Sequence, residues 1–214
     1  MAEMQAQPVA LSYNEEKNLI REVNGIAYNR YAIRTHVIQY GDDLVEVTKQ
    51  YTQGLLQPGD IFFITEKAVA CTQQRAIPMA DIHPRPLAKF LCKFVKKTPY
   101  GIGLGIPETM EMALRECGTL RILLAAFVSA IGKLFGQHGW FYKVAGTKAR
   151  AIDGPCDCTL PPYNHYVVLS PAEPEKVAER VSKALGVPTL ITDINDLGAD
   201  ILGAYPPDID CALM

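Results

Sequence analysis

No stretch of this sequence is long and apolar enough to cross a membrane. The most apolar segment, residues 120–135, is interrupted by Arg121, Ser129 and Lys133, whereas a spanning helix needs about 20 predominantly apolar residues. Residues 1–18 also lack the basic start and the apolar core of a secretory signal. These absences predict a cytoplasmic protein without a membrane partner.

An excess of positive charge is missing as well. The 214 residues include 21 lysines and arginines and 23 aspartates and glutamates, which gives a net charge of −2. Proteins that bind nucleic acid normally carry a basic field, so we expect no nucleic-acid partner. The hydrophobic fraction of 49% is instead typical of a globular protein with a sizeable core.

Two common catalytic signatures are absent. The chain has no GxSxG, the turn that exposes a nucleophilic serine, and no GxxxxGK[ST], the phosphate-binding loop of many nucleotide switches. Without an export signal, the six cysteines are expected to be reduced. Cys156 and Cys158 form one CxC pair, whereas structural zinc usually takes four ligands. A regulator based on zinc or on thiols is therefore a hypothesis that we rank third, behind the two functions given at the end of this section.

Short apolar segments alternate with helical ones, which favours an α+β (mixed α/β) fold with helices covering a mixed sheet. We expect an N-terminal arm at 1–28, a single domain over 29–205 and a C-terminal tail at 206–214. The apolar helix should be buried on nearly all sides, and the strand at 61–65 on both faces. The expected strands are 32–38, 61–65, 166–169 and, as the last, 189–192; the expected helices are 43–51 (capped by Asp42), 86–97, 107–117, 119–135 and 174–185.

Residues 141–164 carry charges of both signs among glycines and prolines, without a hydrophobic period. A glycine–proline pair cannot sit inside a helix, so we expect a long ordered loop, which often forms a binding site. Lys148 and Arg150 suit phosphate or carboxylate groups. Asp153 and Asp157 suit Mg²⁺ or Mn²⁺. An internal salt-bridge network that braces the loop is the alternative.

A glycine-rich segment precedes the helix expected at 107–117. Gly101, Gly103 and Gly105 alternate in it and would let the backbone approach a ligand closely, and the amides that begin the helix could hold an anion. Glu108 in the first turn is a candidate metal ligand, although it also suits the helix dipole. A turn against which another element packs is the alternative for the whole segment.

Polar residues follow two of the expected strands. Lys67 comes after the strand at 61–65, and Asp193 and Asn195 come after the strand at 189–192. Ligands of α/β proteins tend to bind at the carboxyl ends of strands, where Lys67 could meet a phosphate and the other two a cation or a ribose. A solvated lysine and an ordinary polar turn are the alternatives.

Four segments read GDIFFITEKAVA, TPYGIGLGIPET, GKLFGQHGWFYKVAGTKARAIDG and DINDLGADILG. In this order they resemble segments of the coenzyme F420-0:γ-glutamyl ligase family, over roughly residues 32–204, with this chain as a short, diverged member. The resemblance implies a homodimeric ligase that uses GTP or ATP with Mg²⁺ or Mn²⁺. Such a ligase joins an amino acid such as glutamate to a carboxylate substrate through an acyl phosphate. The resemblance also implies that the last segment is an acidic helix.

The resemblance assigns roles to the candidate residues, with Glu108 as the nearest match to the acid of the family's glycine segment. The family carries a metal-binding Asp-Thr pair at a strand end, whereas the matching place here, residues 129–133, has no carboxylate. A diverged, non-catalytic protein that binds a small molecule or nucleotide is therefore the alternative function. The candidates are Lys67, Lys148 and Arg150 for catalysis; Gly101, Gly103, Gly105, Thr147 and Asn195 for nucleotide binding; and Glu108, Asp153, Asp157 and Asp193 for metal.

Overall fold

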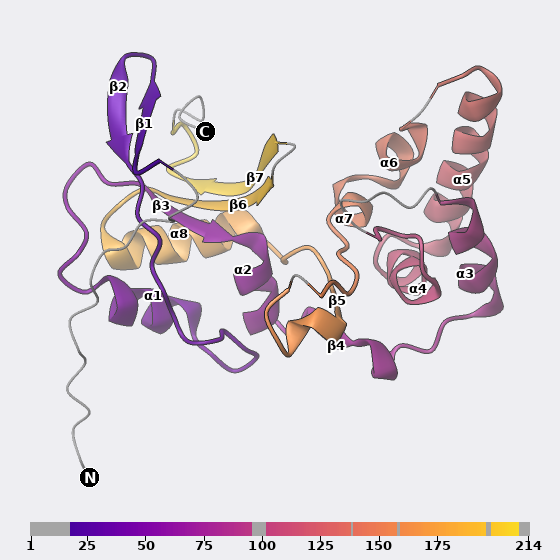
Figure 1. Cartoon of the computed structure of the whole chain (residues 1–214), viewed down its shortest axis with the longest axis horizontal. Coiled ribbons are helices and arrows are strands. Elements are labelled where there is room, and N and C mark those ends of the chain that lie inside the picture. Colours follow the sequence, from indigo (N-terminus) through magenta and orange to yellow (C-terminus); the bar gives the residue numbers. More distant parts are fainter. Residues whose placement is uncertain (1–17, 96–101, 138, 158, 196–197, 210–214) are drawn as a thin grey trace, which may run out of the picture. The chain divides into compact units, whose positions relative to one another are not determined.

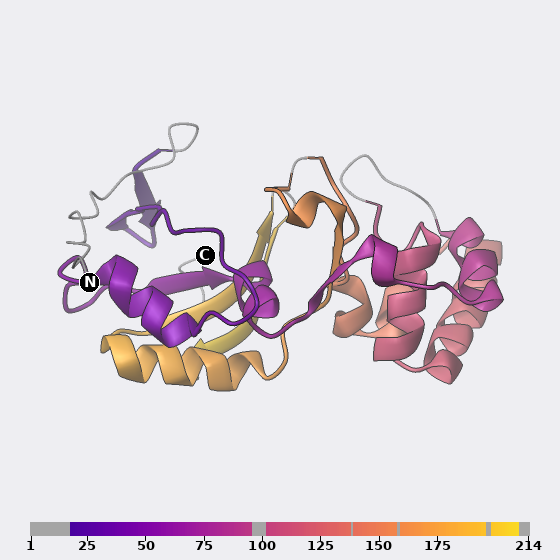
Figure 2. The same cartoon turned by 90° about the horizontal axis from the view of Figure 1, so that it is seen from below.

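The computed structural model describes residues 18–95, 102–137, 139–157, 159–195 and 198–209. It divides into two compact units (Figures 1 and 2). Unit 1 consists of Met1–Thr72 and Glu173–Met214, and unit 2 is Gln73–Ala172, so unit 2 is inserted into the sequence of unit 1. Helices combined with a mixed sheet confirm the predicted fold class. The division into an arm, one domain and a tail stays a prediction.

Unit 1 is built on a three-stranded sheet in the order β3-β6-β7. β3 (Phe62–Thr65) runs parallel to β6 (Thr189–Asn195), and β6 pairs antiparallel with β7 (Gly198–Tyr205). α8 (Pro174–Leu185) lies along the sheet against β6 and β7 (Figure 2), and α1 (Leu44–Thr52) packs against α8. The sheet is therefore mixed, as the sequence predicted.

Local sequence signals fix the two ends of α8. Pro174 lies in the first turn, where its missing N–H has no partner to lose. Gly186 has a φ of +75° and donates its N–H to the Ser182 carbonyl at 2.8 Å, which ends the helix. Between these ends Ala178 and Val181 are fully buried and form part of the core of unit 1.

A β-hairpin precedes α1. β1 (Ile20–Val23) pairs antiparallel with β2 (Ile26–Asn29). The two residues between them, Asn24 and Gly25, have φ values of +51° and +79°. Positive φ at both positions is the requirement of a type I′ turn, which Asn-Gly meets well. The described part of the predicted N-terminal arm is thus a hairpin.

Side chains rather than a sheet organise the segment before α1. The strand predicted at 32–38 is wrong, because this stretch forms no strand in the structure. Instead His36 Nε2 lies 3.1 Å from Asp42 Oδ2. Asp42 is thereby engaged outside the helix, and the cap is the next residue: Asp43 accepts from the Val45 N–H at 2.8 Å. An apolar–polar alternation does not reveal such side-chain pairing.

Unit 2 combines a two-stranded sheet with helices (Figure 1). β4 (Ala76–Pro78) pairs antiparallel with β5 (Tyr166–Val168). The helix predicted at 86–97 is shorter than expected, because the chain tightens into a 3₁₀ turn after one and a half turns. The helices are α3 (Pro86–Leu91), α4 (Pro107–Glu116), α5 (Thr119–Leu134), α6 (Trp140–Ala145) and α7 (Thr147–Arg150), with 3₁₀ turns η1 (Met79–Asp81), η2 (Cys92–Phe94) and η3 (Tyr163–His165).

The two ends of unit 2 are joined side by side. The Gln73 side chain donates from Nε2 to the Ala172 carbonyl at 2.9 Å, and the Ala172 amide donates back to Gln73 Oε1 at 2.7 Å. Close by, the Leu169 amide donates to the Arg75 carbonyl at 2.9 Å. The chain therefore enters and leaves unit 2 at one place.

Residues 140–150 are helical, which corrects the expectation of a continuous loop over 141–164. α6 and α7 each follow a glycine with positive φ, Gly139 at +84° and Gly146 at +92°. The sequence between these glycines, WFYKVA, contains neither glycine nor proline, so nothing in it opposes a short helix. The glycines mark helix boundaries rather than an extended loop.

α5 has the predicted length but not the predicted burial. Ile122, Ala125 and Gly132 are its buried residues. Leu120 and Leu134, by contrast, are each 84% exposed. The expectation of burial on nearly all sides is therefore wrong, because apolar composition alone does not show which face of a helix has a partner.

β3 and β6 also differ from expectation. β3 is an edge strand whose Phe63 is 41% exposed, so it is not buried on both faces. β6 is not the last strand. The segment 193–203 was implied to be an acidic helix, but its described residues, 193–195 and 198–203, belong instead to the antiparallel strands β6 and β7, in which Asp193 faces Asp200. Strand pairing decided this segment, since its own sequence is compatible with either structure.

The contact between β7 and α8 predicts a sharp cost for one added methyl group. A Cβ at Gly203 would lie 2.4 Å from the Pro174 carbonyl carbon and 2.6 Å from the Glu175 nitrogen, both backbone atoms of α8. Gly203→Ala should lower the free energy of unfolding by about 1–3 kcal/mol, measured by urea denaturation. Gly198→Ala in the same strand, where a Cβ meets nothing within 4 Å, should change it by less than about 0.5 kcal/mol. Equal effects of the two substitutions would contradict this packing.

Candidate functional site

Unit 2 contains most of the residues predicted to form a site. Lys67 and Asp193 belong to unit 1, as does Asn195, whose side chain lies outside the described part of the chain; Gly101 lies outside it altogether. The predicted residues within the described part of unit 2 are Gly103, Gly105, Glu108, Thr147, Lys148, Arg150, Asp153 and Asp157.

The glycine segment forms a tight turn against α6. The Gly105 amide donates to the Ile102 carbonyl at 3.0 Å, and Gly103 has a φ of +49°. A Cβ at Gly103 would lie 3.4 Å from the Tyr142 hydroxyl. Burial raises the pKa of Tyr142, and a backbone hydrogen bond from Leu104 partly opposes that rise. The expected close backbone approach is therefore present, with a tyrosine of unit 2 as one neighbour.

The glycine segment also meets the stretch at 141–164. A Cβ at Gly154 would lie 3.2 Å from Thr109 Cγ2 and 3.6 Å from the Ile102 Cβ. Thr109 lies in the first turn of α4, next to Glu108. Two segments singled out separately in the sequence are thus packed together at the beginning of α4. Asp153, the residue before Gly154, is tied to β5 by paired backbone hydrogen bonds of 2.9 Å with Val168.

A cluster of charges surrounds the other end of α4. Glu116 accepts from Arg75 Nη2 at 2.5 Å, and Lys148 Nζ lies 3.7 Å from the same carboxylate oxygen. Arg75 Nε also donates to the Ser170 carbonyl. The carboxylate is mostly buried while Lys148 is 65% exposed, so the lysine is the accessible member. Lys148 was predicted from sequence, whereas Arg75 and Glu116 were missed, because no local pattern links residues 41 positions apart.

Arg121 and Cys117 complete this group, which we name the Glu116 cluster (Arg75, Glu116, Cys117, Arg121 and Lys148). The Arg121 Nε donates to the Val144 carbonyl at 2.9 Å, and a Cβ at Gly146 would lie 2.7 Å from its guanidinium nitrogen. Burial and then the Glu116 charge raise the pKa of Cys117, while Arg121 and Lys148 oppose them. With three cations and one carboxylate, the cluster can attract an anion such as a phosphate or carboxylate.

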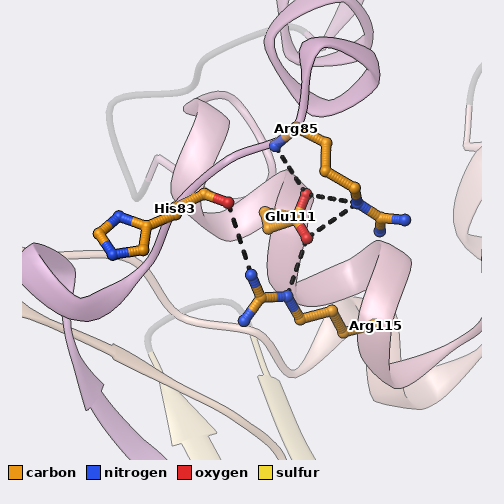
Figure 3. A network of polar contacts seen from close by, with 4 residues as sticks. All are labelled: His83, Arg85, Glu111 and Arg115. Atoms are coloured by element: carbon orange, nitrogen blue, oxygen red, sulfur yellow. Dashed lines mark hydrogen bonds and ion pairs between the residues drawn. The ribbon is translucent and has the colours of Figure 1, made fainter.

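A second polar centre lies in the middle of α4 (Figure 3). The Glu111 side chain is 1% exposed and accepts from Arg85 Nε at 3.0 Å and from Arg115 Nε at 2.8 Å. The Arg85 amide donates to it at 3.1 Å, and Arg115 reaches the His83 carbonyl at 3.5 Å. Burial pushes the Glu111 pKa upward, but the hydrogen bonds from both arginines outweigh it and hold the pKa below its usual 4.5. This Glu111 network fixes the start of α3 onto α4.

A family profile described as F420-0:Gamma-glutamyl ligase matches residues 32–192, which is most of the chain and includes all of unit 2. The chain belongs to the F420-0:Gamma-glutamyl ligase family. No curated protein matched the chain. In this family member, both the glycine turn and the Glu116 cluster lie inside the matched span.

The described residues of this F420-0:Gamma-glutamyl ligase family member do not by themselves assemble a metal site. No three His, Cys, Asp or Glu side chains among them come together in a way that could hold an ion. Residues 129–133, which the resemblance aligned with a metal-binding Asp-Thr pair, lie within α5. A Mg²⁺ ion that is bound together with nucleotide phosphates needs only one or two carboxylates from the protein. Metal binding of this kind by Glu108, Asp153, Asp157 and Asp193 stays a prediction.

In unit 1, the predicted residues do lie at one end of two neighbouring strands. Thr65 of β3 pairs with Thr192 of β6 in parallel register. Lys67, near the start of α2 (Glu66–Thr72), follows β3 at this edge. Asp193, expected after the strand, lies within β6 directly beyond Thr192, because β6 extends to Asn195. Both residues take part in interactions within the structure. This is the position at which α/β proteins commonly bind ligands, and it was readable from the two apolar strands.

The cysteines do not follow the expectation of a fully reduced set. Cys156 is disulfide-bonded, whereas Cys92 and Cys117 are free thiols. A cysteine in a disulfide cannot supply a thiolate to zinc, so the zinc form of the third hypothesis loses its first ligand. Cys117 has a charged environment that affects its pKa.

The Glu111 network predicts a loss of stability in acid. Because the folded-state pKa of Glu111 lies below its usual 4.5, its contribution is fully present above that pH and is lost as the pH falls through the folded value. Glu111→Gln should lower the free energy of unfolding at neutral pH by about 1–3 kcal/mol and flatten its dependence on pH below 4.5. Urea melts across that pH range measure both effects. The control is Asp42→Asn, which removes another carboxylate with a lowered pKa and should leave the contribution of Glu111 to the pH dependence unchanged.

The Glu116 cluster predicts a slow thiol at Cys117. Since its pKa lies above the usual 9.0, little thiolate exists at neutral pH, and alkylation by iodoacetamide should be slower than that of a free cysteine peptide. Glu116→Gln removes a charge that raises the pKa and should speed alkylation. Lys148→Ala removes a charge that lowers the pKa and should slow it. Peptide mass spectrometry follows the reaction, and equal rates in the two variants would contradict the assignment.

Proposed function

We propose that this protein is a nucleotide-dependent carbon–nitrogen ligase that joins an amino acid such as glutamate to a small-molecule carboxylate. The observation that carries the proposal is membership of a γ-glutamyl ligase family over residues 32–192. The cationic Glu116 cluster and the glycine turn in unit 2 support it, because both suit anionic substrates. A cytoplasmic location and a homodimer are part of the same proposal.

The reaction would have two balanced steps. An oxygen of the substrate carboxylate attacks the γ-phosphorus of GTP or ATP, and the nucleoside diphosphate leaves, which gives an acyl phosphate. The amino-acid amine, after losing a proton to solvent, attacks the acyl carbon, the C–N bond forms and phosphate leaves. The cations of the site would stabilise the charge that develops on the phosphoryl oxygens.

The predicted residues fit these steps in distinct ways. Lys148, an exposed member of the Glu116 cluster, and Arg150 would meet phosphate or carboxylate groups in unit 2, and Lys67 would do so in unit 1. Mg²⁺ or Mn²⁺ would supply charge neutralisation on the phosphates. The residues proposed to approach the nucleotide are Gly101, Gly103, Gly105, Thr147 and Asn195, and those proposed for the metal ion are Glu108, Asp153, Asp157 and Asp193.

One observation favours a second candidate function. Residues 129–133 carry no carboxylate and lie within α5, and the described acids form no metal-binding group. A non-catalytic protein that binds a nucleotide or small molecule on this scaffold would need neither. It differs from the ligase in one measurable respect: it binds without turnover.

A paired binding and turnover experiment tests the proposal. GTP or ATP with Mg²⁺ should raise the melting temperature, since a ligand at 100 times its Kd adds about 2.7 kcal/mol, and should release phosphate when glutamate and a carboxylate substrate are supplied. Lys148→Ala should weaken nucleotide binding about ten-fold or more, because a hydrogen bond to a charged group is worth about 1.5–3 kcal/mol.

The matched control is Lys176→Ala, an exposed lysine of α8 that also pairs with one glutamate and should behave as wild type. Binding without phosphate release across a panel of carboxylates and amino acids would favour the second candidate. If no nucleotide binds and none leads to phosphate release, that result would contradict both the ligase and the non-catalytic nucleotide-binding protein.

A further inference from the structure

The two units carry opposite charge. Gln73–Ala172 contains 12 lysines and arginines and six aspartates and glutamates, a net charge of +6, while the remainder of the chain carries −8. These values cancel almost completely in the whole protein. A strong asymmetry of this kind indicates that the cationic part meets an anionic surface.

One face of α5 is apolar, and no element among the described residues covers it. Leu120, Leu124, Phe127 and Leu134 are 84%, 55%, 64% and 84% exposed. Their spacing places them along one side of the helix, opposite Ile122 in the core. Large apolar side chains grouped in this way on a soluble surface mark an interaction site.

The neighbouring α3–η2 segment repeats the pattern with charge added. Phe90 and Phe94 are exposed and stack edge to face with ring centroids 5.1 Å apart. An exposed lysine directly precedes each phenylalanine: Lys89 before Phe90, and Lys93 before Phe94. Lys133 of α5 donates from Nζ to the Phe94 carbonyl at 3.2 Å, which places the end of η2 beside the last turn of α5 (Figure 1).

The charged residues that α3, η2 and α5 themselves carry have one sign, whereas the carboxylates nearby belong to α4 (Glu108, Glu111 and Glu116). Residues 82–107 contain five lysines and arginines, and residues 117–152 contain five more, with no aspartate or glutamate in either stretch. A second copy of the chain docked face to face would set these cations against each other. A nucleic acid would match the charge but would leave the leucines and phenylalanines in water. An anionic lipid surface satisfies both the apolar and the cationic side chains.

We propose that α5 together with α3–η2 forms a membrane-binding face that lies on the surface of an anionic lipid bilayer. α5 has 16 residues and is about 24 Å long, shorter than a hydrocarbon core of about 30 Å. No single helix in the described ranges is long and apolar enough to span a bilayer, and the chain bends by 117° at the break between α4 and α5. The helix therefore lies along the interface. This inference is independent of the ligase proposal, and it departs from the expectation, drawn from the sequence, of a protein without a membrane partner.

Vesicle sedimentation of the full chain tests this face. The protein should pellet with vesicles of phosphatidylcholine mixed with phosphatidylserine, remain in solution with phosphatidylcholine alone, and be released by high salt. Leu124→Gln combined with Phe127→Gln should lower the partition coefficient at least about ten-fold, through lost apolar burial. Lys89→Gln and Lys93→Gln should each lower it about five-fold.

The matched control is Ile26→Gln, which removes a comparably exposed apolar side chain (55%) from unit 1 and should leave binding unchanged. Circular dichroism and thermal melts establish that each variant is folded. The proposal is overturned if the protein stays in solution with both vesicles, if it binds both equally, or if folded variants bind as wild type. A dimer that Phe127→Gln dissociates, or RNA binding without vesicle binding, would also overturn it and would assign the face to that partner.

Discussion

The Glu111 carboxylate, almost wholly shielded from water and shared by Arg85 and Arg115, is the interaction on which the geometry of unit 2 depends. It joins the start of α3 to the middle of α4. α4 in turn carries the glycine turn at its beginning and the Glu116 cluster at its end. A charged group removed from water must remain bonded on all sides, so this one carboxylate restricts where both ends of α4 can lie.

Elements with local signals were predictable from the sequence. α8 follows from its proline and glycine boundaries, and β3 and β6 follow from short apolar runs. Prediction failed where long-range partners decided the outcome. Residues 193–195 and 198–203 became strands because β6 and β7 pair, and the exposed face of α5 depends on which neighbours are present rather than on composition. The net charge of the whole chain likewise did not reveal that the two units have opposite charge, because a sum over all residues does not show where the charges lie.

The candidate site shows the same division. Lys148 stood out in the sequence as a cation among glycines, and Lys67 and Asp193 stood out as residues after apolar strands. Arg75, Glu116 and Arg121 did not, since they come from the segment before β4, the end of α4 and the beginning of α5, which only the fold brings together. Glycines 146 and 154 were read as loop residues, yet their role is spatial: each gives a close neighbour the room that a Cβ would occupy.

The reciprocal bonds between Gln73 and Ala172 make unit 2 an insertion with adjoining ends. Because its entry and exit share one point, the host sheet needs only a short bridge there to remain continuous. Changes of length or sequence between those residues need not alter the register of β3 against β6. Such an arrangement lets evolution exchange the inserted module while the host is kept, and it defines the natural cut points for expressing each half alone.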